Sequence, residues 1–155
     1  MRYLVTGGAG FIGSNFVRFL LRERPDTEVI NLDALSYAGN RDNIANIMDD
    51  PRHRFIHGDI CDSNTVARAI KGIDVVVNLA AETHVDRSIS SDVHFVRTNV
   101  VGTATLLSAA LDSGVQRFIQ VSTDEVYGAL PWVDPENHDS SDTPKFTEET
   151  PVSPR

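Results

Sequence analysis

A hydroxyl group and two carboxyl groups stand next to one another in the chain, at Thr123, Asp124 and Glu125. They directly follow residues 117–121, an apolar segment that reads as a β-strand, and Ser122. Two neighbouring carboxyl groups can be driven to different pKa values, so that one donates a proton while the other accepts one. At the carboxyl end of a strand, such a triplet suits general acid–base catalysis. A capped turn explains the same residues equally well, because Thr and Asp also favour turns.

Four glycines separate a short apolar strand at the N-terminus from a periodic apolar helix. Gly8, Gly10 and Gly13 fit the G-x-G-x-x-G pattern, and Gly7 gives a second reading, G-x-x-G-x-x-G, with the last two. Glycine permits a tight turn, a close approach of the backbone to a pyrophosphate, and tight packing of helix on strand. The helix would then direct its free N–H groups at the phosphates. The segment therefore predicts a dinucleotide-binding turn.

An acidic residue lies where such a site needs one. Asp33 ends the apolar strand of residues 28–32, twenty residues after Gly13. A carboxylate at this position accepts hydrogen bonds from a ribose 2′-hydroxyl and repels a 2′-phosphate, which favours NAD over NADP. The alternative is a simple loop cap. Together with the strand, the glycines and the helix, Asp33 favours NAD binding.

Polar residues also follow two other strands. In Gly58-Asp59-Ile60 the carboxylate could reach an adenine amino group, and a cap explains it equally well. After residues 74–79, the small Ala80 and Ala81 leave room for a cofactor, and Thr83 offers a hydroxyl to a ribose or a substrate. The residues beyond, His84, Asp86 and Arg87, read as a solvent-exposed, salt-bridged turn.

Strand and helix patterns alternate along the chain. We expect strands at 1–5, 28–32, 53–57, 74–79 and 117–121, and helices at 11–24, within 36–50, at 63–71 and at 93–113. Ser63 is expected to cap the third helix. Short joints between alternating elements predict an α/β fold with a doubly wound parallel sheet, a Rossmann fold of strand order 3-2-1-4-5 that is incomplete at its C-terminus.

Composition excludes several classes of protein. The net charge of −8 over 155 residues argues against nucleic-acid binding. Cys61 is the only cysteine, so no disulfide can form within the chain, as is compatible with the cytoplasm. The five histidines lack metal-ligand spacing, and we expect no metal site. No apolar run has the length of a membrane span.

These stretches resemble a known family. Thr6-Gly7-Gly8-Ala9-Gly10-Phe11-Ile12-Gly13 is similar to the glycine motif of extended short-chain dehydrogenase/reductases. The resemblance to dTDP-glucose 4,6-dehydratases is closer, and it is carried by Asp33 to Asn40, Ala80 to Ile89, and Ser122 to Gly128. Sugar epimerases of the superfamily usually have small residues after the hydroxyl, so the Thr-Asp-Glu triplet favours a dehydratase.

The resemblance implies an enzyme that oxidises C4 of a nucleotide-sugar with NAD, eliminates water across C5 and C6, and returns hydride to C6. Glu125 would be the base at C5, Asp124 the acid for the C6 hydroxyl, and Thr123 a hydrogen-bond partner near O4. Thr83 and Thr123 would contact the substrate, and Asn99 would have a structural or proton-relay role. The residues implied to line the NAD site are Gly7, Gly10, Phe11, Ile12, Gly13, Asp33, Ala34, Leu35, Ser36, Asp59, Ile60, Leu79, Ala80, Ala81, Glu82, Thr83 and Thr98.

The chain departs from the family in one respect. The family needs a Tyr-x-x-x-Lys pair, and none of the three tyrosines has a lysine four residues later. We therefore expect the N-terminal part of a dehydratase: an NAD-binding domain at 1–128, and an acidic loop at 129–155 that holds five of the seven prolines. The substrate domain would be absent, and the complete protein would be a homodimer acting on dTDP-glucose. The alternatives are another epimerase or dehydratase of the superfamily, a non-catalytic NAD-binding module, and an interaction fragment.

Overall fold

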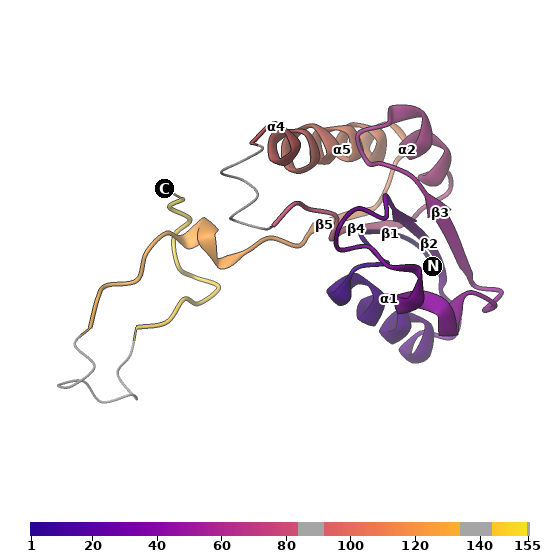
Figure 1. Cartoon of the computed structure of the whole chain (residues 1–155), viewed down its shortest axis with the longest axis horizontal. Coiled ribbons are helices and arrows are strands. Elements are labelled where there is room, and N and C mark those ends of the chain that lie inside the picture. Colours follow the sequence, from indigo (N-terminus) through magenta and orange to yellow (C-terminus); the bar gives the residue numbers. More distant parts are fainter. Residues whose placement is uncertain (84–91, 134–143, 155) are drawn as a thin grey trace. The chain divides into compact units, whose positions relative to one another are not determined.

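The computed structural model describes residues 1–83, 92–133 and 144–154 (Figure 1). The turn expected at His84, Asp86 and Arg87 and the middle of the expected acidic loop lie outside these residues. The chain divides into two compact units, Met1–Val121 and Ser122–Arg155. The domain boundary expected after residue 128 stays a prediction. In the part of the chain that is described, no helix has the length and apolar character needed to cross a bilayer.

The first unit is built on a five-stranded sheet in which every neighbouring pair of strands is parallel. Its order, β3-β2-β1-β4-β5, confirms the order expected from the sequence. Reversal of the strand order next to β1 creates a crevice at the carboxyl ends of the strands, where such folds bind ligands. The strands are β1 (Arg2–Thr6), β2 (Glu28–Asp33), β3 (His53–His57), β4 (Val75–Asn78) and β5 (Arg117–Gln120).

Helices cover both faces of this sheet (Figure 1). α1 (Phe11–Glu23) and the 3₁₀ helix η1 (Arg41–Ile47) pack on one face, and α2 (Ser63–Ala69) and α5 (Thr103–Asp112) pack on the other. Successive residues of a strand point to opposite faces. On β4, accordingly, Val76 joins the core beneath α2 and α5, whereas its neighbours Val75 and Val77 join the core beneath α1. Two apolar cores thus fix the sheet between its helices.

The long helix expected at 93–113 is three joined segments: α4 (Asp92–Phe95), a π-helical segment η2 (Val96–Gly102), and α5. The widened turns bring Gly102 against Ile60, where an added Cβ would lie 2.6 Å from the Ile60 side chain. One expected cap was wrong. Asp62, not Ser63, is the N-cap of α2, because its carboxylate accepts a hydrogen bond from the backbone N–H of Asn64 while Ser63 is already helical.

The second unit contains a short 3₁₀ helix, η3 (Asp124–Tyr127). The ring of Tyr127 stacks on Phe146, with ring centroids 5.1 Å apart. The backbone N–H of Ser153 donates to the carbonyl of Val126 at 2.8 Å. Gly128 has φ +83°, and a Cβ on it would lie 2.5 Å from the carbonyl oxygen of Ser153. Residues 146 and 153 therefore hold η3 in place.

Candidate functional site

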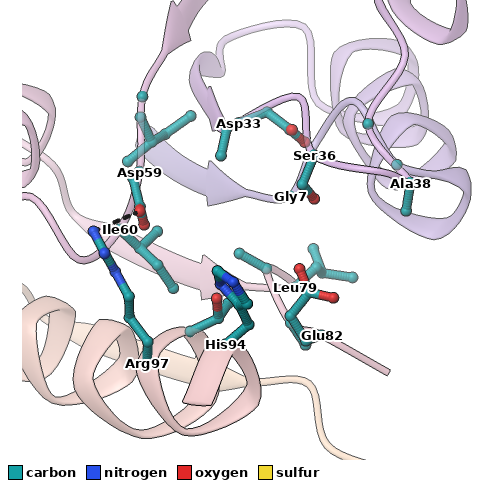
Figure 2. Close-up of a pocket in the computed structure, with 18 residues that line it drawn as sticks. Gly7, Asp33, Ser36, Ala38, Asp59, Ile60, Leu79, Glu82, His94 and Arg97 are labelled. Atoms are coloured by element: carbon teal, nitrogen blue, oxygen red, sulfur yellow. Dashed lines mark ion pairs between the residues drawn. The ribbon is translucent and has the colours of Figure 1, made fainter. Parts of the chain in front are cut away.

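A cleft of about 360 Å³ opens at the carboxyl ends of the strands in the first unit (Figure 2). Its walls come from the glycine-rich turn after β1, the loops after β2, β3 and β4, and one side of α4 and η2. Twelve of the residues predicted for the NAD site line it: Gly7, Gly10, Asp33, Ala34, Ser36, Asp59, Ile60, Leu79, Ala80, Ala81, Glu82 and Thr98. The fold thus brings five separate sequence segments together in one crevice.

Five residues predicted for the same site lie outside the cleft lining. Phe11 and Ile12 are exposed at the start of α1, and Gly13 packs against the glycine-rich turn. Leu35 packs into the core beneath α1 and has φ 51°. The hydroxyl of Thr83 faces the hydroxyl of Tyr37.

The glycine-rich turn leaves no space for side chains. Gly7 has φ +70°, and a Cβ on it would lie 2.7 Å from the backbone nitrogen of Ala80. A Cβ on Gly13 would overlap the carbonyl group of Gly7. Gly8 faces the side chain of Asn31, away from the cleft, while Gly7 and Gly10 line it. The geometry therefore fits the G-x-x-G-x-x-G reading better than G-x-G-x-x-G.

The first turn of α1 suits an anion. Its N-cap residue is Gly10, which provides no side-chain cap, and the turn contains no acidic residue. The first N–H groups of a helix need external partners, and the helix dipole makes that end positive. A phosphate group lying over Gly10 would meet both requirements.

Asp33 is 7 % exposed, and both of its carboxylate oxygens are engaged. One accepts the backbone N–H of Ala9 at 2.8 Å, and the other accepts that of Leu35 at 2.8 Å. A carboxylate has about four acceptor positions, so two remain for a ligand. Asp33 therefore fixes the glycine-rich turn to the loop after β2 and still presents acceptors to the cleft, which it lines.

Side-chain amides hold the wall formed by the loop after β4. Thr6 donates to Oδ1 of Asn78, and the backbone N–H of Ala80 reaches the Thr6 hydroxyl at 3.3 Å. Asn99, on η2, accepts the N–H of Glu82 at 2.9 Å and donates to its carbonyl at 2.9 Å. Asn99 therefore holds the backbone of Glu82 in place, which is a structural role.

A tyrosine joins two of the walls. The hydroxyl of Tyr37 lies 3.3 Å from the hydroxyl of Thr83 and 3.4 Å from its backbone nitrogen. The neighbours of Tyr37, Ser36 and Ala38, line the cleft on one side, and Glu82 lines it on the other. The hydrogen bonds therefore link the loop after β2 to the loop after β4.

Sequence reasoning missed several lining residues. His94 and Arg97 project into the cleft from α4 and η2 (Figure 2), and Arg97 lies 3.6 Å from the Asp59 carboxylate. His94 was considered only as a metal ligand, for which its spacing is unsuitable, and Arg97 belongs to no motif. The helical spacing of 94, 97 and 98 could have placed both beside Thr98, which was predicted. The other lining residues that were missed are Leu32, Ala38, Gly39 and Gly58.

In the second unit, Asp124 and Glu125 are exposed in the first turn of η3, preceded by Thr123 as its N-cap. Among the described residues, no group of three or more His, Cys, Asp or Glu side chains could hold a metal ion.

Known proteins are similar to this chain over its whole length. Low-salt glycan biosynthesis protein Agl12 of Haloferax volcanii is 57 % identical over 155 residues, which are all of this chain and 46 % of Agl12. The dTDP-glucose 4,6-dehydratase of Streptomyces griseus is 54 % identical over 153 residues, covering 97 % of this chain and 43 % of that enzyme. The chain thus spans somewhat less than half the length of these curated relatives.

The fold of this chain is also similar to that of a solved dehydratase structure. The crystal structure of DesIV, the dTDP-glucose 4,6-dehydratase of Streptomyces venezuelae, contains bound NAD and superimposes with a TM-score of 0.85 at 52 % identity. The match covers 99 % of this chain and 46 % of DesIV. These similarities confirm the resemblance carried by the sequence motifs. The profile of the GDP-mannose 4,6 dehydratase family matches residues 4–155, and the chain belongs to that family.

Proposed function

We propose that this chain is the NAD-binding part of a nucleotide-sugar 4,6-dehydratase that converts dTDP-glucose to dTDP-4-keto-6-deoxyglucose. The observation that carries the proposal is the cleft itself, in which a glycine turn without room for side chains lies beside the buried carboxylate of Asp33. The NAD-bound dehydratase from Streptomyces venezuelae, with its TM-score of 0.85, supports it.

The residues present fit a dinucleotide. The pyrophosphate would lie over Gly7 and Gly10 and accept hydrogen bonds from the backbone N–H groups of Phe11, Ile12 and Gly13, whose side chains need not face the cleft. Asp33 would bind the ribose diol, with the loop Ala34, Leu35 and Ser36 beside it. Asp59 and Ile60 would contact the adenine. Leu79, Ala80, Ala81, Glu82, Thr83 and Thr98 would flank the remainder of the cofactor.

NAD preference is tested by calorimetric titration with NAD and NADP in parallel. We expect NAD to bind more tightly, because a 2′-phosphate would face the Asp33 carboxylate. Asp33→Asn should lower the preference for NAD. Circular dichroism checks that this variant is folded, since Asp33 also binds Ala9 and Leu35. Equal binding of NAD and NADP by the unaltered protein would contradict the assignment.

The acid–base residues would act on the sugar. NAD, when bound, supplies the hydride acceptor for C4 and the hydride donor for C6. Glu125 would remove the C5 proton, Asp124 would protonate the departing C6 hydroxyl, and Thr123 would hydrogen-bond to O4. Thr83 would also contact the substrate. Both carboxyl groups are exposed on one short helix, where each is accessible to a substrate.

The C4 hydroxyl proton needs its own acceptor, which the family provides with a Tyr-x-x-x-Lys pair that these 155 residues lack. We therefore expect this chain alone to bind NAD without turnover, and dehydration of dTDP-glucose by it would contradict this. Fusion to the C-terminal portion of the Streptomyces griseus enzyme should restore activity. In that fusion, Glu125→Gln should abolish exchange of the C5 proton with solvent deuterium, whereas Asp124→Asn should retain exchange and lose dehydration.

We also propose a homodimer, formed through the outer face of α4, η2 and α5. Large apolar side chains recur there at helical spacing and are exposed, between 46 % at Leu107 and 82 % at Leu111. Exposed apolar stripes of this kind mark interfaces. The face consists of Val93, Val96, Val100, Leu107 and Leu111. Light scattering should show a dimer that Val100→Glu converts to monomer, and a monomeric unaltered protein would contradict this.

The proposed location is the cytoplasm. The free thiol of Cys61 and the absence of any other cysteine are compatible with a reducing compartment. Fractionation of cells that produce the protein, with immunodetection in each fraction, tests the location.

A further inference from the structure

The carboxylate of Asp59 and the guanidinium of Arg97 face each other across one end of the cleft. Figure 2 shows the two side chains pointing toward one another, Asp59 from the loop after β3 and Arg97 from η2. Arg97 Nη2 lies 3.6 Å from Asp59 Oδ2, and both residues line the cleft. The two side chains are 62 % and 43 % exposed, so a ligand entering the cleft can still reach them.

The Asp59 carboxylate is anchored at only one oxygen by the backbone. Its Oδ1 accepts the N–H of Cys61 at 2.8 Å, and Oδ2 faces Arg97. At 3.6 Å the contact is electrostatic and beyond ordinary hydrogen-bond length, so the lone pairs of Oδ2 stay available to a donor. Arg97 therefore attracts Oδ2 electrostatically and leaves its acceptor positions open to a ligand.

The backbone around Arg97 is held against the loop after β3. The thiol of Cys61 donates to the backbone carbonyl of Arg97 at 3.2 Å, and burial raises the pKa of that thiol, which favours the protonated donor. Five residues after Arg97, at the end of η2, Gly102 lies against Ile60 with no space for a Cβ. The loop 59–61 and η2 are thus joined at two places around the ion pair.

Arg97 also has a distinctive charge in the cleft. Of the described residues that line the cleft, Asp33, Asp59 and Glu82 carry carboxylates, and Arg97 is the one with a permanent positive charge. When a planar base covers Asp59, water leaves the carboxylate, and an unpaired charge there would be costly. A neighbouring guanidinium reduces that cost.

We propose that Arg97 is a positioning residue for adenine: it holds the Asp59 carboxylate so that Oδ2 accepts the exocyclic amino group of the base. The inference rests on the proposed NAD binding and adds a residue that no motif identified. It assigns to η2 a part in recognising the base, by way of the loop after β3.

The test is a double-mutant cycle for binding of ADP-ribose, which contains the adenosine half of NAD, with NAD titrated in parallel. Arg97→Gln should weaken binding about threefold to tenfold, since exposed ion pairs contribute modestly and each tenfold is 1.4 kcal/mol. Arg97→Lys, which keeps the charge, should recover part of the loss. In an Asp59→Asn background, Arg97→Gln should have almost no further effect, because the partner charge is gone.

Arg22→Gln is the matched control, because it removes one positive charge from the last turn of α1, at the opposite end of that helix from the glycine-rich turn. If Arg97→Gln behaves like Arg22→Gln while the unaltered protein binds NAD, the inference fails and the proposed function stands. An equal loss from Arg97→Gln with and without Asp59 would also overturn it. If the unaltered protein binds neither ADP-ribose nor NAD, both proposals fail.

Discussion

The hydroxyl of Thr6 donates a hydrogen bond to Oδ1 of Asn78, and this contact joins β1 to β4 directly beneath the cleft. Both residues are completely buried. The amide of Asn78 continues the network to Gln120 on β5 at 2.8 Å. One polar ladder therefore links three adjacent strands at the point where the strand order reverses.

Thr6→Val keeps the shape of the side chain and removes the donor. It should lower the free energy of unfolding by about 1–3 kcal/mol, because Asn78 Oδ1 would remain buried without its partner. Urea unfolding measures the change. Thr105→Val is the control, since the Thr105 hydroxyl donates to the carbonyl of Val101 in an exposed position on α5. A loss no greater than that of the control would show that the ladder contributes little.

Two glycines with nearly the same backbone conformation should respond differently to substitution. Gly7 has φ +70° and Gly114 has φ +67°, but only Gly7 has backbone atoms where a Cβ would lie. Gly114→Ala should cost about 1–2 kcal/mol from the left-handed conformation alone. Gly7→Ala should cost more and should abolish NAD binding, as thermal unfolding and calorimetry would measure. Similar losses in both variants would mean that the turn relaxes around the new methyl group.

The hydrogen bond between Tyr37 and Thr83 predicts slow release of the cofactor. It links two loops that flank the cleft, and we expect these loops to separate when a bound dinucleotide leaves. Tyr37→Phe should raise the dissociation rate of NADH several-fold, measured by stopped-flow displacement. NADH should dissociate more slowly from Thr83→Ser, which keeps a hydroxyl, than from Thr83→Val. Unchanged rates in Tyr37→Phe and Thr83→Val would contradict the prediction.

Stability should fall on mild acidification because of His53. Burial lowers the pKa of His53 below its usual 6.5, against the opposing effects of the Ile47 backbone and the Asp50 charge. Below pH 6.5 His53 is therefore protonated in the unfolded chain but still neutral in the folded chain. As the pH falls toward the folded-state pKa, the free energy of unfolding decreases. Urea unfolding between about pH 7.5 and 5 should show this decrease. His53→Gln, which does not titrate, should flatten the profile in that range.

The sequence was most informative where backbone requirements dictate residue type. Short apolar segments predicted the five strands, and the glycines and Asp33 predicted the cleft, because close packing and a buried carboxylate leave few alternatives. Contacts between distant segments could not be predicted in this way. The pairing of Asp59 with Arg97 depends on η2, and the spacing of its apolar residues does not distinguish π-helical from α-helical turns. The same is true of Asn99 and Glu82, which only the fold brings together.

The stacking of Tyr127 on Phe146 and the hydrogen bond from Ser153 to Val126 also impose an order in time. Both contacts join η3 to residues synthesised nineteen or more positions later. While the chain is being made, Asp124 and Glu125 leave the ribosome before the segment that fixes their helix. The five strands of the first unit can pair before that segment emerges. The carboxyl groups of Asp124 and Glu125 are therefore expected to take their positions on η3 only after the five strands of the first unit have paired.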